Sequence, residues 1–162
     1  MQDISPGTAQ PRTTVLRLIA WLLPVAYAAH LLEEYLAGVT LPVWLNTHMG
    51  ADLSNSDFLW INSVAMAIVL FNAVTYQLGH GRSVVLVAIV FLFTLNGVLH
   101  GLGTIYWGQY APGTVTGLAI YLPFGTLALS WLSRQAARHI MQTGITVGLI
   151  AHAVVIIIAR GI

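Results

Sequence analysis

The residues best able to do chemistry in this chain stand together in the segment His30-Leu31-Leu32-Glu33-Glu34. At about 100° per residue in a helix, Glu34 lies about 40° from His30 and Glu33 about 60° on its other side, so all three share one face. An imidazole and a carboxylate four residues apart can bind one metal ion, or they can exchange a proton with a substrate. The segment therefore predicts a metal site or an acid–base site.

The composition places this chemistry inside a membrane. Of the 162 residues, 57% are hydrophobic and only 7% are charged, whereas soluble domains carry about 25% charged residues. A formal net charge of +1 offers no basic surface for nucleic acid, and the absence of cysteine excludes disulfides, thiolate zinc sites and iron–sulfur clusters. We predict a single-domain, all-α, polytopic integral membrane protein.

Five segments reach the length of about 20 apolar residues that a membrane-spanning helix needs. They cover residues 15–37, 58–78, 83–107, 115–132 and 140–159, after a polar tail, residues 1–14, that we predict to be disordered. The gap at 39–57 is predicted to lie at the membrane interface, with Trp44 as an anchor. Residues 26–28 resemble a signal-peptide cleavage site, but the apolar run continues past them, which favours an uncleaved span.

Arginine, the only basic residue besides histidine, sets the expected orientation. With the N-terminus in the cytoplasm and the C-terminus outside, five of the six arginines face the cytoplasm and only Arg160 does not. The five are Arg12, Arg17, Arg82, Arg134 and Arg138.

The polar residues of different spans fall at one depth in this arrangement. Counting about 1.5 Å per residue from the span ends places them in one slab in the outer half of the bilayer. They are His30, Glu33, Glu34, Asn62, Asn96, His100, Tyr121 and His152. We therefore expect a single buried polar site, on which the side chains of His30, Glu34, His100 and His152 converge. Ionisable groups are costly in lipid, so such a cluster is a functional hypothesis by default.

Three motifs connect this site with a known family. They are H-x-x-E-E at residues 30–34, N-x-x-x-H at 96–100 and Y-x-P-G at 110–113. In this order, on a five-span pattern, they resemble the HXXEE family of small bacterial membrane proteins. The resemblance implies a bacterial cytoplasmic membrane and a suspected enzyme whose active site the motifs form, with Tyr110, Pro112 and Gly113 as a lip over it. A looser similarity to membrane proteins of linaridin peptide-antibiotic pathways implies peptide epimerisation or dehydration.

Two catalytic interpretations fit these residues. In the first, His30, Glu34, His100 and His152 bind a divalent metal, zinc or else iron or manganese, and Glu33 is the general base of a hydrolase acting on a lipid or amphipathic substrate. In the second, no metal is present, and the histidines, glutamates and Asn96 perform acid–base chemistry on a peptide or isoprenoid, as an epimerase, dehydratase or isomerase would. Asn62 and Tyr121 are expected to contact the substrate.

A third interpretation is not catalytic. The cluster would then bind an ion or a solute as part of a larger membrane complex. Gly97, Gly101, Gly144 and Gly148 lie four apart in two pairs, which predicts close helix packing within the bundle, against a partner protein or against a second copy of the chain. The expected partners are otherwise membrane lipids and an unidentified small or peptide substrate, and no nucleic acid is expected.

Overall fold

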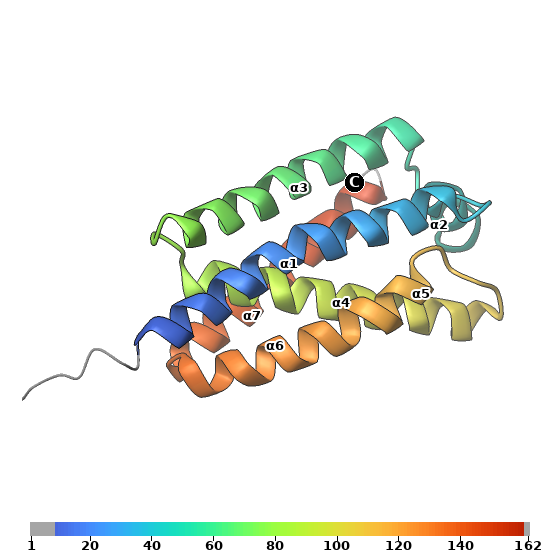
Figure 1. Cartoon of the computed structure of the whole chain (residues 1–162). Helices are drawn as coiled ribbons and strands as arrows, with labels where there is room; N and C mark the ends of the chain where they lie inside the picture. Colours follow the sequence, from blue (N-terminus) through green and yellow to red (C-terminus); the bar gives the residue numbers. More distant parts are fainter. Residues whose placement is uncertain (1–8, 161–162) are drawn as a thin grey trace, which may run out of the picture.

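The chain folds into a bundle of long helices, in which the start of the first helix and the end of the last helix lie at opposite ends of the bundle (Figure 1). The computed structural model describes residues 9–160. The helices are α1 (Ala9–Leu36), α2 (Leu41–Met49), α3 (Asn55–Gln77), α4 (Ser83–Trp107), α5 (Thr114–Thr116), the π-helical turn η1 (Gly117–Tyr121), α6 (Leu122–Gln135) and α7 (Arg138–Ala159). Within the described residues, five helices are long and apolar enough to cross a membrane, the fourth of them formed by α5, η1 and α6 together. The protein is therefore a multi-pass helical membrane protein, as predicted.

The third predicted span coincides with α4, and the others differ from the helices by a few residues at their ends. The predicted tail was wrong for residues 9–14, because α1 already begins at Ala9. Pro11 is compatible with this start, since the first turn of a helix needs no backbone N–H from proline. Residues 1–8, the rest of the predicted tail, lie outside the described residues.

α4 is the central helix of the bundle, and glycine lets its neighbours approach closely. α7 packs along one side of it, where a Cβ on Gly148 would lie 2.6 Å from the carbonyl oxygen of Ala88. η1 packs on another side, where a Cβ on Gly97 would lie 2.5 Å from the carbonyl oxygen of Gly117. The predicted close packing of the glycine faces is thus confirmed, and it occurs inside the chain.

α1 and α3 form the other wall of the bundle. Tyr27 on α1 donates a hydrogen bond to the Asn62 Oδ1 on α3 (2.5 Å). α2 folds across one end of the bundle, and its Trp44 ring is buried beside Gly103 and stacked on His48. The prediction of Trp44 as an interface anchor was therefore wrong, because the ring fills a space inside the fold.

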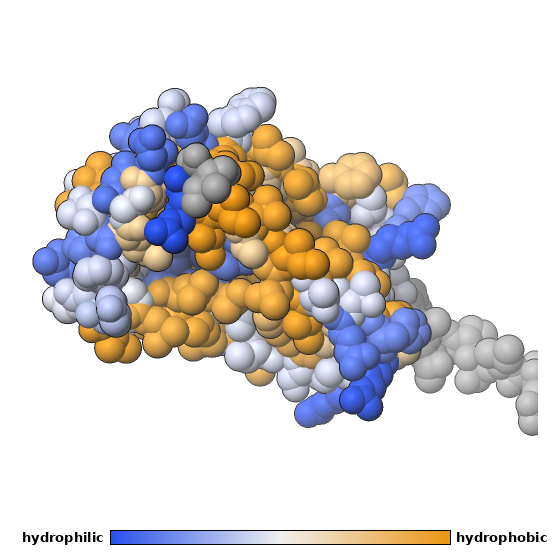
Figure 2. Space-filling view, turned by 180° about the vertical axis from the view of Figure 1, so that it is seen from behind, coloured by the Kyte–Doolittle hydropathy of each residue, from blue (hydrophilic) through white to orange (hydrophobic). Residues whose placement is uncertain are grey.

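Hydropathy divides the surface into three zones. Seen from behind, the middle of the molecule is covered mainly by apolar side chains, and hydrophilic side chains gather at the two ends (Figure 2). This distribution is the one that a bilayer requires, with an apolar belt in the hydrocarbon layer and polar groups in water.

Candidate functional site

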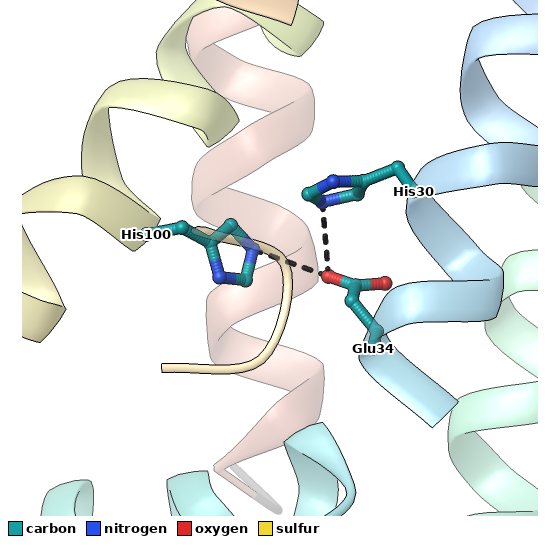
Figure 3. Close-up of side chains that lie close together, drawn as sticks. All are labelled: His30, Glu34 and His100. Carbon is teal, nitrogen blue, oxygen red and sulfur yellow. Dashed lines mark ion pairs between the residues drawn. The ribbon is translucent and has the colours of Figure 1, made fainter. Parts of the chain in front are cut away.

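The site is built around one carboxylate oxygen. Glu34 Oε1 lies 3.2 Å from His30 Nε2 and 3.1 Å from His100 Nε2, and all three side chains are buried. The three ligand atoms lie within 4.8 Å of one another. Figure 3 shows the two imidazoles reaching this oxygen from different helices. His30 and Glu34 are one turn apart on α1, and His100 comes from α4, so the sequence prediction that these three converge is confirmed.

The second nitrogen of His30 is also engaged, and this engagement defines its protonation. His30 Nδ1 lies 2.7 Å from the hydroxyl oxygen of Thr116, and the Thr116 side chain is also hydrogen-bonded to the Glu33 carboxylate. An ionised carboxylate only accepts, so the hydroxyl donates to Glu33 and accepts from Nδ1–H. The proton of a neutral His30 then lies on Nδ1, and its Nε2 lone pair points towards Glu34 and His100.

Asn96 contacts the same nitrogen. Its Nδ2 donates to His30 Nε2 at 2.9 Å, which fits an Nε2 without a proton. Asn96 stands one turn before His100 on α4, as the N-x-x-x-H spacing predicts. The amide and the Glu34 carboxylate therefore face the same lone pair from two sides.

Glu33 points to a different partner. Its carboxylate accepts hydrogen bonds from the backbone N–H of Val115 (2.9 Å) and of Thr116 (2.6 Å), at the first turn of the fourth span. Tyr110 Oη donates to the same carboxylate. A carboxylate is favourable at a helix N-terminus, where unpaired N–H groups and the helix dipole both attract it. The geometry therefore favours Glu33 as a positioning residue, and its predicted role as general base stays a prediction.

The Y-x-P-G segment closes over the two imidazoles. Gly113 has a φ of 96°, and a Cβ there would lie 2.8 Å from His30 Cε1 and 2.9 Å from His100 Cε1. Glycine is thus required both by the backbone conformation and by the rings beneath it. Pro112 is fully buried in the same turn, so the segment forms a cover packed against the two imidazoles, and its predicted role as a lip over a substrate stays a prediction.

Tyr110, the first residue of this segment, holds the cover to Glu33. Tyr110 stands outside the spans, and burial together with the Glu33 carboxylate raises the pKa of its phenol to about 12. The phenol therefore stays protonated, and able to donate, throughout the physiological pH range.

A cavity of about 400 Å³ lies beside the site. Its walls are mostly apolar, and its polar lining residues gather on the side nearer α2. They are Tyr27, His30, Glu34, Asn62, Asn96, Tyr121 and His152. His152 is outside the group of three converging ligand atoms, so the structure places it at the cavity wall, and its predicted role as a ligand stays a prediction.

Tyr121 has an unusual environment. It belongs to the π-helical turn that precedes Pro123, whose missing N–H disturbs the regular helix there. Its ring packs on that of His30, with centroids 4.3 Å apart. The side chain is 1% exposed, and within the described residues its hydroxyl has no hydrogen-bond partner. Because buried hydroxyls are nearly always paired, the unpaired hydroxyl of this cavity-lining residue is exceptional.

Two contributors to the site were not found from the sequence. Thr116 orients the His30 imidazole. The position of Thr116 at the start of a span that faces the H-x-x-E-E segment is the signal that could have identified it. Tyr27 lines the cavity and bonds to Asn62. It lies three residues before His30 and therefore on the same helix face.

Comparison with protein families finds one match. The family described as "Protein of unknown function with HXXEE motif" matches residues 21–128, which is more than half of the chain. The matched region contains all three motifs. Neither the curated proteins nor the solved structures contain a match.

Proposed function

Because the chain belongs to the HXXEE family, whose function is unknown, we propose from the geometry of the site that it is an intramembrane metal-dependent enzyme. In this proposal His30, Glu34 and His100 hold one divalent cation, zinc or else iron or manganese. The reaction is the hydrolysis of a lipid or another amphipathic molecule in the cavity. The observation that carries the proposal is the convergence of three ligand atoms from two helices on one buried point.

The distances within this group support a metal. Zinc bonds of about 2.0–2.2 Å to nitrogen and oxygen place neighbouring ligand atoms of a tetrahedral site about 3.3 Å apart. The separations of Glu34 Oε1 from the two Nε2 atoms are 3.2 and 3.1 Å, and all three ligand atoms lie within 4.8 Å of one another. The Thr116 hydroxyl on His30 Nδ1 is the kind of partner that orients metal-binding histidines and leaves their other nitrogen free to bind.

Charge balance supports the same conclusion. Glu34 is 4% exposed, and within residues 9–160 no arginine is paired with it. An ionised carboxylate in the membrane interior is costly unless a positive charge offsets it. A divalent cation between Glu34 and two neutral imidazoles provides this charge without protonating either ring.

Three protein ligands leave coordination positions for water and substrate, which is typical of catalytic zinc sites. A cation here would polarise a substrate carbonyl or phosphoryl oxygen and lower the pKa of a nearby water molecule. Asn96 and Tyr121 line the cavity next to the ligands and would orient the substrate. We place the protein in the bacterial cytoplasmic membrane, with this site in the outer half of the bilayer.

The decisive experiment is elemental mass spectrometry on protein purified in detergent without chelators. We expect about one metal ion per chain in the wild type, and loss of the metal in Glu34→Gln and His100→Ala. The matched control is His139→Ala, because His139 is exposed at the start of α7, away from the site. A metal-free wild type, or equal metal content in His100→Ala and His139→Ala, would refute the metal site.

One observation favours a metal-free alternative. Asn96 already donates to His30 Nε2, so a metal at that nitrogen must displace the amide. Without a metal, Glu34 and the two histidines form an acid–base group beside the cavity, suited to an epimerase, dehydratase or isomerase. In that case the wild type contains no metal, and Glu34→Gln abolishes proton exchange at the substrate carbon, measured in deuterated buffer with candidate peptides or isoprenoids.

A further inference from the structure

The cavity beside the site opens through the side of the bundle. Four of its lining side chains are exposed on the molecular surface: Ile68 on α3, Val85 on α4, and Val147 and Val155 on α7. All four belong to membrane-spanning helices. α3 packs mainly on α1, and α7 packs mainly on α4, so the opening lies between α3 and α7, facing the hydrocarbon layer.

The α2 end of the cavity is closed. Leu53, Phe58 and Ala159 are buried there in one apolar cluster, and Leu41 and Leu45 of the α2 helix pack against it. The backbone N–H of Asp52 also donates to the carbonyl of Ala159, which ties the α2–α3 connection to the end of α7. A ligand therefore reaches the site through the opening in the apolar belt.

The shape of the cavity limits what it can hold. Its lining follows α4 from Val84 to Asn96 and α7 from Val147 to Ala159, a length of about 18 Å at 1.5 Å per residue. Its volume of about 400 Å³ is near the lower end of the range of about 300–1,000 Å³ for ligand pockets. A long and narrow apolar space accommodates one hydrocarbon chain, and two chains side by side would exceed it.

The ligand must also offer a polar group at one point. On the side away from α2 the lining is apolar, including Val84, Val85 and Ile89, whereas His30 and Glu34 lie on the side nearer α2. Tyr121 lines the same region, and its buried hydroxyl has no partner in the described part of the chain. A chain with a single polar head group, which donates or accepts at this hydroxyl, satisfies both halves of the cavity.

We propose that the substrate is an amphiphile with one hydrocarbon chain, acyl or isoprenoid, which reaches the site sideways from the bilayer between α3 and α7. Its chain lies along α4 and α7, and its head group rests against Glu34 and Tyr121. That this amphiphile is a substrate rests on the proposed function. Its binding in the cavity is tested independently of that function.

The test uses the full chain in phosphatidylcholine vesicles with a palmitic acid analogue that carries a diazirine in its chain. After irradiation, mass spectrometry maps the crosslinked residues, which we expect on the cavity-facing positions of α4 and α7. Val155→Trp places an indole at the opening and should lower this crosslinking about tenfold, because the ring and the chain compete for one packed space. The matched control is Val154→Trp, since Val154 is 46% exposed against 40% for Val155 but does not line the cavity.

A second pair of variants, on the opposite wall of the cavity, keeps the test valid if a variant of the first pair fails to fold. Ile68→Trp should also lower crosslinking, whereas Leu70→Trp should not, because both residues are exposed on α3 and only Ile68 lines the cavity. Equal crosslinking in both members of each pair, or crosslinks spread evenly over the lipid-facing helices, would overturn the lateral route. Metal content measured on the same preparations keeps the two proposals apart: metal without cavity crosslinks refutes this inference alone, and cavity crosslinks without metal refute the metal site alone.

Discussion

The hydroxyl of Thr116 offers the sharpest test of how the site is organised. Its oxygen lies 2.7 Å from His30 Nδ1 and holds the imidazole in the form that presents Nε2 to Glu34. Replacing Thr116 with valine keeps the shape of the side chain and removes only the hydroxyl, and with it the hydrogen bonds to His30 and to the Glu33 carboxylate. The backbone N–H of residue 116 still donates to Glu33, so the cover and the span should stay in place.

The expected loss can be estimated. Partners that orient metal-binding histidines typically contribute about 10- to 100-fold to metal affinity, which corresponds to about 1.4–2.8 kcal/mol. We therefore expect the zinc dissociation constant of Thr116→Val, measured by competition with a chromophoric chelator in detergent, to rise by one to two decades. Thr116→Ser restores the hydroxyl and should bind nearly as tightly as the wild type.

A threonine outside the site provides the control. Thr126 on α6 is exposed, and its hydroxyl donates to the backbone carbonyls of Leu122 and Pro123. Thr126→Val should therefore leave zinc affinity unchanged. If Thr116→Val binds zinc as tightly as Thr126→Val, or if Thr116→Ser binds as weakly as Thr116→Val, the assigned role of the hydroxyl is wrong.

Three further predictions concern the turn at Gly113, the hydrogen bond from Tyr110 to Glu33, and the orientation of the chain in the membrane. Gly113→Ala should abolish metal binding, because its Cβ would meet both imidazoles. Gly108→Ala should retain the metal in elemental analysis, because Gly108 also has a left-handed backbone (φ 60°) but nothing lies within 4 Å of its added Cβ. The hydrogen bond of Tyr110, whose pKa is raised from 10.0 to about 12, should contribute stability that is complete below pH 10 and lost as the pH rises through 12. The measurement is the difference in melting temperature between the wild type and Tyr110→Phe. The absence of a difference near neutral pH would contradict a stabilising hydrogen bond. Since the chain lacks cysteine, Ser56→Cys should react with a membrane-impermeant maleimide on intact cells and His80→Cys should not, and the reverse pattern would invert the predicted topology.

The spans and the three converging residues could be predicted from the sequence because each depends on a short-range regularity. Apolar runs of sufficient length define membrane helices. His30 and Glu34 share a face by their spacing alone, and equal depth in the bilayer then brings His100 to the same level. The apolar cavity and its side opening could not be predicted, because they depend on which helices pack together. In this bundle α3 packs on α1 and α7 on α4, and no pattern within one helix encodes that choice.

Trp44 shows the same limit on a smaller scale. A tryptophan between two spans is typical of the membrane interface, and the sequence offers no reason to expect otherwise. Its ring is nevertheless buried, because Gly103 on α4 leaves a space that the indole fills. The exposure of a large side chain thus depended on a small residue nearly sixty positions away in the chain.

The two adjacent glutamates have different partners in the fold, and this difference limits the repulsion between their carboxylates. Two neighbouring carboxylates in a membrane span repel each other, and a metal, a shared proton or a basic partner can offset this repulsion. The structure gives them different partners: Glu34 faces the two imidazoles, and Glu33 accepts from the first turn of the fourth span. That span begins after Gly113, which has no side chain to cap it, so Glu33 supplies the missing acceptor from another helix. Only one carboxylate is then left for the site to neutralise. A single divalent cation or a single protonated imidazole is sufficient for this purpose, and the measurement of metal content distinguishes these two possibilities.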